Sequence, residues 1–431
     1  MHTLLILGGK SRRFWPLAEK PLFPVCGKTL AGHQIERLNK AGCKNVILVV
    51  STDNKEEIQA AFPRLKIAVQ TEDTIGMHHA VLAGLSLVKS GPVLIASGND
   101  FFDPSAYASL LREGKKKGVD GAILAQHVDK YFPGGYLTVK NGQVTSIVEK
   151  PGAGKEPSDL VNIVAHLHND AAALLKALQK TDRKADDGYE QALDVLLKTH
   201  QYRAVPYKGM WKAVKYPWQL LSLLPSLLAE IKKPVVHRSA KIHKTAVVEG
   251  NVVIGKDVRI LPHATVVGPC YIGDGSIVGN NALVRGSSIG ERCVVGYNSE
   301  VKGSVLAGPV WTHMTYLGDS VIGRNVSFGG GCMTGNLRLD EGEIASMAGD
   351  AMIGSGLTKF GAIIGNDCRI GIQTGINPGV KIGPSTFVSR GVFLTGDVPD
   401  KSYVMVKDGK TEIRQNRTVV PGMEGRKKYF R

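Results

Sequence analysis

Residues 236–289 read VHRSAK-IHKTAV-VEGNVV-IGKDVR-ILPHAT-VVGPCY-IGDGSI-VGNNAL-VRGSSI when they are divided into units of six. Each unit begins with Val or Ile, and its fifth residue is small or short. The phase slips by one residue at Ile289, and a second run with the same spacing extends from Ile364 to Leu394. A period of six fits neither an α-helix nor a simple strand alternation. It is the hexapeptide repeat of a parallel β-helix, in which three units form a triangular coil around buried aliphatic residues.

Two segments at the end of the chain depart from the repeat. Residues 336–359 do not keep the period and contain several charged residues and glycines, so we expect a projecting loop there. After Val406 the chain becomes basic, from Lys407 to Arg431. This tail is either a solvated segment or a contact to a phosphate on a neighbouring subunit.

The first half has a different rhythm. Short aliphatic runs at 3–7, 46–50 and 93–96 alternate with helix-length stretches at 32–41 and 76–89. This alternation predicts a mostly parallel sheet covered by helices. A leucine-rich amphipathic helix at about 218–232 should pack one half onto the other. We therefore expect an α/β domain over 1–216, a linker helix over 217–233, a β-helix over 234–406 and a basic tail over 407–431.

The composition narrows the range of partners. The chain has 54 Lys and Arg against 38 Asp and Glu, a net charge of +16, which favours anionic ligands such as nucleotides and sugar phosphates. The basic residues are not interleaved with aromatic residues, so no nucleic-acid partner is expected. The six cysteines form no CxxC pair and are scattered over the chain, so neither a zinc site nor a disulfide framework is expected. This favours the reducing cytosol as the location of the protein. No apolar run is long enough for a signal segment or a membrane span, so we expect a cytoplasmic protein.

A glycine turn follows the first predicted strand. Gly8 and Gly9 allow backbone N–H groups to approach phosphate oxygens, and Arg13 can bind such oxygens in a bidentate manner. Lys20 follows in the segment EKPLFPV at 19–25. These features predict a phosphate-binding site near the amino terminus.

Further segments follow in a characteristic order. GMHHA stands at 76–80, SGND at 97–100 and EKP at 149–151, together with Gln70, Gly135 and Asn162. With the glycine turn and Lys20, this pattern resembles the sugar-1-phosphate nucleotidylyltransferases over nearly all of residues 1–230. The resemblance implies a Rossmann-like α/β fold and transfer of a nucleotidyl group, most simply from UTP, to a sugar-1-phosphate with release of pyrophosphate.

The resemblance also assigns roles to individual residues. It implies that Arg13 and Lys20 neutralise phosphate charge and that Asp100 binds Mg²⁺. The implied substrate-binding residues are Gly9, Gln70 and Gly76 for the nucleotide and Gly135, Glu149 and Asn162 for the sugar.

Three positions depart from that family pattern. Ser11 stands in the loop where a glycine and a threonine are expected nearby, and Met77 replaces a threonine. Ala213 occupies the position of a second metal ligand in a W-x-D segment. Loss of one carboxylate should weaken Mg²⁺ binding.

A second resemblance lies within the repeats. WTHMTYLGD at 311–319, FGGG at 328–331 and TGNLRLD at 334–340 are similar to segments of the bifunctional N-acetylglucosamine-1-phosphate uridylyltransferase/glucosamine-1-phosphate acetyltransferases, closest to their archaeal-type branch. The resemblance spans about 236–406. It implies a left-handed parallel β-helix, a homotrimer and acetyl-CoA as the acetyl donor.

In this resemblance His313 matches the catalytic base, which takes a proton from the glucosamine amine. The implied substrate-binding residues are Arg285 and Lys302 for the acceptor phosphate, Tyr316 and Asn336 for the sugar, and Lys359 at a further basic position.

Three hypotheses remain open at this point. The first is a bifunctional enzyme of UDP-N-acetylglucosamine synthesis. The second is an acetyltransferase with a degenerate nucleotidylyltransferase half, motivated by Ser11, Met77 and Ala213. The third is a non-catalytic regulatory or assembly subunit with the same domains.

Overall fold

The chain forms two compact units. The computed structural model describes residues 1–17, 19–70, 76–181 and 187–421. One unit comprises Met1–Lys10 and Ala31–Ala213, and the other comprises Ser11–Leu30 and Val214–Arg431. The segment Ser11–Leu30, called the 11–30 segment below, therefore belongs to the unit that contains the repeats. This grouping does not follow the order of the sequence.

The first unit is built on a nine-stranded sheet with the order β5-β4-β1-β6-β11-β8-β12-β10-β9. Its strands are β1 His2–Ile6, β4 Val46–Ser51, β5 Lys66–Gln70, β6 Val93–Ser97, β8 Gly121–His127, β9 Gly135–Lys140, β10 Gln143–Glu149, β11 Leu160–His168 and β12 Tyr202–Pro206. A separate pair is formed by β7 Asp100–Phe102 and β13 Trp211–Ala213.

The sheet is only partly parallel. Strands β5, β4, β1 and β6 run parallel, as in a Rossmann-like domain, whereas β11 is antiparallel to both β6 and β8. The prediction of a mostly parallel sheet is wrong for this second half. One reason is local: Asn141 and Gly142 both have positive φ and form a tight turn between β9 and β10, which makes these strands antiparallel.

Helices cover both faces of this sheet. The helices of the unit are α1 Leu30–Lys40, α2 Lys55–Ala61, α3 His78–Leu85, α4 Pro104–Gly114, α5 Ala171–Leu178 and α6 Gly188–Leu197. Helices α3, α5 and α6 share one apolar cluster with the sheet, while α4 packs against β8 and β11 with residues outside that cluster. No helix among the described residues is both long and apolar enough to cross a bilayer.

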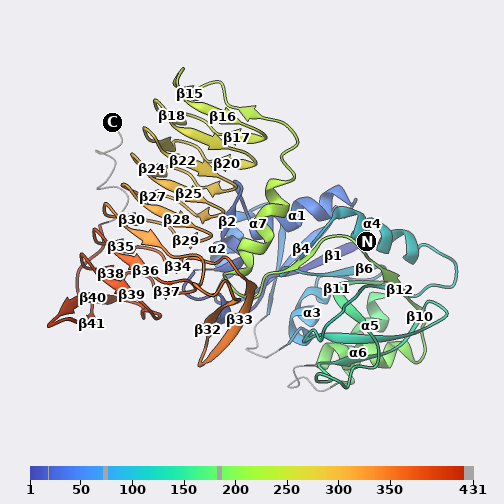
Figure 1. Ribbon diagram of the computed structural model, residues 1–431. Coiled ribbons are helices and arrows are strands. Elements are labelled where there is room, and N and C mark those ends of the chain that lie inside the picture. Colours follow the sequence, from blue (N-terminus) through green and yellow to red (C-terminus); the bar gives the residue numbers. More distant parts are fainter. Residues whose placement is uncertain (18, 71–75, 182–186, 422–431) are drawn as a thin grey trace. The chain divides into compact units, whose positions relative to one another are not determined.

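The second unit contains three sheets that the chain visits in turn, and their strands run parallel except for the final antiparallel pair β40–β41 (Figure 1). The first sheet comprises β14 Val235–Val236, β17 Val252–Ile254, β20 Cys270–Ile272, β23 Ser288–Ile289, β26 Val305–Leu306, β29 Val321–Ile322, β34 Ile363–Ile364 and β37 Lys381–Ile382. The second comprises β15 Lys241–Ile242, β18 Arg259–Ile260, β21 Ile277–Val278, β24 Val294–Val295, β27 Val310–Trp311, β30 Val326–Phe328, β35 Arg369–Ile370, β38 Phe387–Val388, β40 Ser402–Lys407 and β41 Lys410–Gln415. The third comprises β16 Val247–Glu249, β19 Thr265–Val267, β22 Leu283–Arg285, β25 Glu300–Lys302, β28 Tyr316–Gly318, β31 Met333–Thr334, β36 Gly375–Ile376 and β39 Phe393–Leu394.

This arrangement is the coil stack that the six-residue period predicts. On the third sheet Val266, Val284, Val301 and Leu317 are successive partners in register, and each has no exposed surface. Each such side chain contributes roughly 1.5–3 kcal/mol by its burial. Cys293 and Cys368 fill small interior positions, where burial raises the pKa of each thiol to about 12 and keeps it unreactive.

Additional elements decorate the stack. The 11–30 segment forms two 3₁₀ turns, Arg12–Phe14 and Lys20–Leu22, and a small pair of strands, β2 Pro24–Val25 and β3 Lys28–Thr29. Helix α7, Gln219–Leu228, buries six leucines and packs against β26. A helix therefore occupies most of the stretch predicted at about 218–232, and its contact to β26 lies within the second unit.

The segment predicted as a loop contains a hairpin. Strands β32 Ile344–Ala348 and β33 Ala351–Leu357 pair in antiparallel fashion, and a bridge between Leu337 and Lys359 closes the base. In the basic tail, β41 continues to Gln415, and Arg426 with the basic residues beyond it lies outside the described residues.

Removing buried volume from the column should weaken the whole stack. In Val266→Ala two buried carbon atoms are lost at a site without exposed surface, so we expect a decrease of about 2–3 kcal/mol in the free energy of unfolding, measured by urea titration. The matched control is Val247→Ala on the neighbouring strand β16, whose side chain is 44% exposed. It should change stability by less than about 0.5 kcal/mol. Equal effects of the two substitutions would contradict the assignment of the column as the stabilising core.

Candidate active sites

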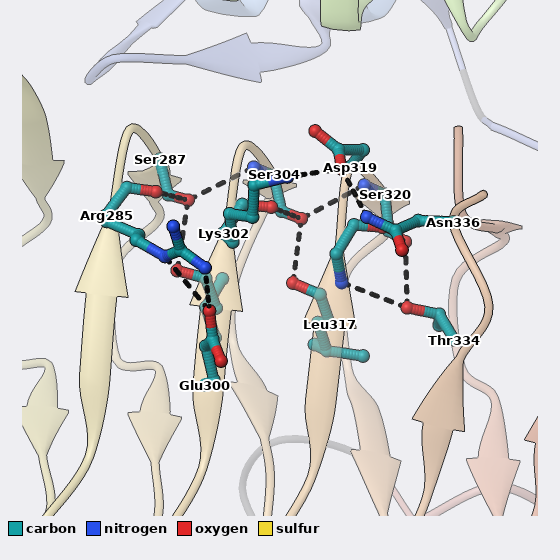
Figure 2. Close-up of polar contacts among 12 residues, drawn as sticks. Arg285, Ser287, Glu300, Lys302, Ser304, Leu317, Asp319, Ser320, Thr334 and Asn336 are labelled. Atoms are coloured by element: carbon teal, nitrogen blue, oxygen red, sulfur yellow. Dashed lines mark hydrogen bonds and ion pairs between the residues drawn. The ribbon is translucent and has the colours of Figure 1, made fainter. Parts of the chain in front are cut away.

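Charged side chains form a row on the third sheet of the β-helix. Arg285, Lys302 and Gly318 end three successive strands and are direct partners in register. Figure 2 shows the side chains of Arg285 and Lys302 on neighbouring coils, with Asp319 and Asn336 beyond them. The sequence-predicted residues Arg285, Lys302 and Asn336 are therefore brought to one edge of one sheet.

A ladder of buried hydroxyl groups fixes this edge. Ser287, Ser304 and Ser320 each follow a row residue by two positions and donate a hydrogen bond of 2.8 Å to its carbonyl oxygen. The Ser287 hydroxyl also accepts the N–H of Ser304 at 3.1 Å, and the Ser304 hydroxyl accepts the N–H of Ser320 at 3.0 Å (Figure 2). Because every turn is bonded to the next, the spacing of the row is set by the backbone of the stack.

Each cation of the row has an acidic partner. Arg285 donates from Nε and Nη2 to the same Glu300 oxygen at 3.0 and 2.6 Å. Lys302 Nζ lies 3.1 Å from Asp319 Oδ2, which also accepts a hydrogen bond of 2.5 Å from the Asn336 amide. The Lys302 and Asp319 side chains are only 22% and 17% exposed, so solvent screens this pair weakly. A phosphate dianion at this edge would compete with Asp319 for Lys302.

Sequence reasoning missed both carboxylates as site components. Glu300 is 15 residues from Arg285, and Asp319 is 17 residues from Lys302. These separations are close to one coil of three six-residue units. The repeat itself was therefore the signal that could have placed them.

Tyr316 and Asn336 meet over Gly318. A Cβ atom added at Gly318 would lie 2.5 Å from the Tyr316 hydroxyl oxygen and 2.7 Å from Nδ2 of Asn336. Both side chains thus occupy the space that Gly318 leaves open. The two predicted sugar contacts lie side by side.

His313 lies on the corner that precedes β28. The Thr315 hydroxyl donates to the His313 carbonyl oxygen at 2.8 Å, and Met314 adopts a left-handed conformation with φ of 45°. The imidazole is exposed and has no hydrogen-bond partner within the described part of the chain. On the next coil stands Gly330, where an added Cβ would meet only the His313 carbonyl oxygen, at 3.8 Å. The His313 side chain is therefore accessible, and Gly330 places no side chain on the neighbouring corner.

Lys359 lies at the base of the hairpin. It is exposed and bridges to Leu337, and the neighbouring Phe360 N–H donates to the Asn336 carbonyl oxygen at 2.9 Å. Arg338 hydrogen-bonds Asp340 close by and holds the pKa of that carboxyl at about 2. The hairpin base therefore adds charged groups next to Asn336.

In the first unit, the glycine turn and Gln70 are brought together. An added Cβ at Gly8 would lie 3.2 Å from Oε1 of Gln70, and Gly9 has a φ of 127°, which favours glycine. Asn54, which sequence reasoning missed, is fully buried below this turn. It donates to the Leu7 carbonyl oxygen at 3.2 Å and accepts the Ser51 N–H at 3.0 Å.

Gly76 begins the turn before α3, with a φ of 86°. The following histidines are buried, and Nε2 of His78 lies 2.9 Å from the Leu178 carbonyl oxygen. The imidazole of His78 thus binds the end of α5.

Asp100 is the single carboxylate of its pair of strands. It is 8% exposed, and its Oδ1 accepts a hydrogen bond of 2.9 Å from the indole of Trp211. Its direct partner in register is Ala213, so the residue predicted to stand in place of a second metal ligand faces Asp100 and carries a methyl group. Among the described residues no three His, Cys, Asp or Glu side chains converge to hold a metal ion. Asp100 can offer one oxygen to a Mg²⁺ ion whose other ligands are phosphate oxygens and water.

The predicted sugar contacts lie on adjacent strands. Gly135 and Glu149 are partners in register, and an added Cβ at Gly135 would lie 3.1 Å from a Glu149 carboxylate oxygen. Asn162 follows Val161, which pairs with Tyr136. The three predicted residues therefore come from neighbouring strands β9, β10 and β11.

Arg13 and Lys20 lie in the 11–30 segment, which is attached to the β-helix. The Trp15 indole donates to Asp400 at 2.7 Å, and Nζ of the buried Lys381 lies 4.7 Å from the centre of the Trp15 ring. Further along, the Cys26 N–H donates to the Ser288 hydroxyl at 2.8 Å. The two predicted phosphate-binding cations are thus carried by a segment whose contacts to Asp400, Lys381 and Ser288 lie within the second unit.

Comparison with known proteins agrees with both sets of motifs. The nucleotidyl transferase family matches residues 2–219, and the family described as the GMPPB C-terminal domain matches residues 231–334. A relative from Methanococcus maripaludis, the bifunctional protein GlmU, is 31% identical over 95% of this chain and 98% of its own length. A bifunctional sugar-1-phosphate nucleotidylyltransferase/acetyltransferase from Sulfurisphaera tokodaii is 30% identical over 92% of this chain and 98% of its own.

Among solved structures, UDP-glucose pyrophosphorylase complexed with UDP-glucose covers 53% of this chain and 98% of its own, with a TM-score of 0.46 and 18% identity. The family assignment depends on the full-length relatives and on the family that matches residues 2–219. The chain belongs to the family of bifunctional sugar-1-phosphate nucleotidylyltransferase/acetyltransferases.

Proposed function

We propose that this protein acetylates glucosamine-1-phosphate with acetyl-CoA and then couples N-acetylglucosamine-1-phosphate to UTP, which yields UDP-N-acetylglucosamine and pyrophosphate. The observation that carries the proposal is the exposed imidazole of His313, which has no hydrogen-bond partner among the described residues and lies on the corner that leads into β28, the strand that presents Tyr316 beside Asn336. Two relatives matched over nearly their full length support it: one is named as bifunctional, and the name of the other contains both activities.

In the acetyl transfer, the amine of the sugar attacks the carbonyl carbon of the thioester. A C–N bond forms, the C–S bond breaks, and coenzyme A leaves as the thiol. His313 takes the proton that the amine must lose, a role that requires an accessible neutral imidazole. Lys302 and Arg285 bind the sugar phosphate, while Tyr316 and Asn336 contact the sugar ring.

The acidic partners Glu300 and Asp319 order the cations of the row before substrate binds. With Glu300 and Asp319 in place, Arg285 and Lys302 keep defined positions before substrate binds. The pre-ordered side chains lose little conformational freedom when the phosphate arrives. The phosphate must compete with Asp319 for Lys302, which lowers the binding free energy gained from that contact. We therefore expect a moderate affinity for the sugar phosphate.

In the uridylyl transfer, an oxygen of the sugar phosphate attacks the α-phosphorus of UTP and pyrophosphate leaves. Arg13 and Lys20 neutralise phosphate charge, and Gln70 contacts the base beside the glycine turn. Glu149 and Asn162 hold the sugar. A Mg²⁺ ion held by Asp100 and the phosphates would supply charge stabilisation at the reacting phosphoryl group.

The proposal includes a homotrimer of left-handed β-helices in the cytoplasm. Large apolar side chains are exposed near the His313 corner and on the third sheet, a feature typical of interaction surfaces. They include Met314 at 55%, Met333 at 58%, Ile372 at 50% and Phe393 at 73% exposure. Burial of these side chains against a second copy would also remove water from the His313 site.

A second candidate has a specific observation in its favour. Ala213 faces Asp100 in register, so the nucleotidylyltransferase half has one carboxylate where two are expected. An acetyltransferase with a weak nucleotidylyltransferase half would fit this geometry. Separate measurement of free thiol and of pyrophosphate distinguishes the two candidates.

Substitution of the proposed base should remove one activity only. In His313→Ala we expect acetyl transfer, measured as free thiol, to fall by about 10²–10⁴-fold, because no other group takes the amine proton. Pyrophosphate release from UTP and N-acetylglucosamine-1-phosphate should remain within about twofold. The matched control is His263→Ala, another exposed histidine on a β-helix corner, which should retain both activities. Undiminished acetyl transfer in His313→Ala would exclude the proposed role.

Restoring the second carboxylate should strengthen metal binding. In Ala213→Asp we expect the Mg²⁺ concentration for half-maximal pyrophosphate release to fall at least about tenfold, equivalent to ~1.4 kcal/mol, because two carboxylates would face each other. Ala213→Asn has nearly the same size without the charge and should change this concentration far less. An unchanged Mg²⁺ dependence in Ala213→Asp would show that this position is not at the metal.

A further inference from the structure

A chain of buried polar side chains ends at Asn162. Oδ1 of Asn162 lies 2.5 Å from Nε2 of His166, whose Nδ1 lies 2.8 Å from the Tyr189 hydroxyl. That hydroxyl lies 3.2 Å from Nε2 of His168, whose Nδ1 lies 2.6 Å from the Tyr202 hydroxyl. His166, His168 and Tyr189 have no exposed surface. Of this chain, only Asn162 was predicted from the sequence. The four residues behind it, His166, Tyr189, His168 and Tyr202, were not.

An irregularity in β11 makes the contact between Asn162 and His166 possible. In a regular strand, residues four apart lie about 13 Å from each other. Here Asn162 pairs with Ala125 and His166 pairs with Ile123, so four steps along β11 match two steps along β8. The extra residues form a bulge, and the bulge brings the two side chains into hydrogen-bond distance.

Both histidines are neutral over the physiological range. Burial lowers the pKa of His166 to about 3, against a smaller opposing effect of a hydrogen bond with the Ile163 backbone. Burial and the neighbouring His166 lower the pKa of His168 to about 3. A neutral imidazole carries one N–H and one acceptor nitrogen.

The protons of the chain must therefore all point the same way. Apart from the backbone of Ile163 near His166, the residues His166, Tyr189 and His168 each have two side-chain partners and one proton, so a fully bonded chain has each of them donate on one side and accept on the other. If the protons point toward Asn162, Tyr202 donates to His168 and every hydrogen bond is made. If they point away, the Tyr202 hydroxyl becomes the acceptor and its own proton has no partner among the described residues. Tyr202 is 2% exposed, so that arrangement costs about 1–3 kcal/mol.

This direction decides which end of the Asn162 amide is available. His166 donates from Nε2 to Oδ1, and this hydrogen bond fixes the orientation of the amide, although Oδ1 keeps a second lone pair. The Nδ2 amide group has no hydrogen-bond partner within the part of the chain that the structure describes. It is the polar group that Asn162 can offer to a ligand beside Glu149 and Gly135.

We infer that His166 is a positioning residue that holds the Asn162 amide with its N–H group toward the sugar, so that this site binds a hydrogen-bond acceptor of the sugar phosphate. The inference rests on the proposed function, in which Asn162 contacts the sugar. Glu149 supplies only acceptor oxygens, so the two side chains complement each other. An acceptor group on the sugar, either a hydroxyl oxygen or the acetamido carbonyl, meets the Asn162 N–H.

The test uses product binding, which does not require turnover. Calorimetry with UDP-N-acetylglucosamine and with UDP separates the contribution of the sugar from that of the nucleotide. In Asn162→Asp, His166 still donates to one oxygen, but the group facing the sugar changes from donor to acceptor. We expect the affinity for UDP-N-acetylglucosamine to fall at least about tenfold, whereas that for UDP stays within about twofold. Unchanged binding of UDP-N-acetylglucosamine by Asn162→Asp would overturn the inference.

Two substitutions of His166 test its positioning role. Gln can donate to Asn162 from its amide nitrogen and accept from Tyr189 at its amide oxygen, so His166→Gln should stay close to the wild type. His166→Leu can do neither, and we expect a loss of about 2–10-fold that is confined to the sugar-containing ligand. Equal affinities of His166→Gln and His166→Leu for UDP-N-acetylglucosamine would refute the role of His166.

Folding and the proposed function are controlled separately. Tyr107→Phe removes a fully buried hydroxyl that has no partner among the described residues, and it should leave both affinities unchanged. A wild type that binds UDP-N-acetylglucosamine more tightly than UDP but releases no pyrophosphate would contradict the proposed reaction while the inference is still tested. A wild type that binds both ligands equally would overturn the inference, because the sugar would then have no contact to lose.

Discussion

The β-helix depends on one constraint, the regular return of an aliphatic side chain to the interior every six residues. Because successive coils pair their backbones in register, an interior residue of one coil stacks on that of the next, as Val284 stacks between Val266 and Val301. The column has no exposed surface over most of its length. A polar residue at one interior position would disturb its neighbours above and below, since each coil pairs its backbone with the coils beside it.

The same constraint places the polar groups outside the column. Residues at equivalent positions of successive coils form rows on the outer face, so Arg285 and Lys302 lie next to each other although 17 residues separate them. The hydroxyl ladder under this edge bonds each turn to the next one. The six-residue period that fills the interior thus also sets the distance between the charged side chains on the third sheet. That distance does not depend on a flexible loop.

The repeat explains why the sequence predicted the β-helix so well. The six-residue period can be recognised from neighbouring residues alone, and each further unit of six shows the same pattern again. The hairpin Ile344–Leu357 was missed because its pairing depends on two strands that interrupt the period. In the first unit the early strands were predicted from their aliphatic runs, while the antiparallel pairing of β11 was not, because strand order depends on contacts between distant residues. The placement of the 11–30 segment with the β-helix has the same origin: its contacts to Lys381 and Asp400 join residues more than 360 positions apart.

The candidate sites show the same division between local and distant information. The motifs identified His313, Tyr316 and Asn336, and the structure places Tyr316 and Asn336 together over Gly318. Their acidic neighbours Glu300 and Asp319 were not identified, because an ion pair leaves no signal in a single sequence unless the coil length is used to search for it. In the first unit, the polar chain behind Asn162 depends on a bulge in β11 and on a tyrosine 40 residues away.

The two units therefore order their polar side chains by different physical means. In the β-helix the backbone repeats, and charged groups gain their positions from that regularity and from ion pairs between neighbouring coils, such as that of Lys302 with Asp319. In the α/β unit, β11 contains a bulge, and buried neutral side chains are positioned by a continuous chain of hydrogen bonds. A charged row suits a phosphate, whose binding is dominated by charge and tolerates small displacements. A neutral donor of fixed orientation suits a sugar, whose hydroxyl and amide groups differ mainly in the direction of their hydrogen bonds.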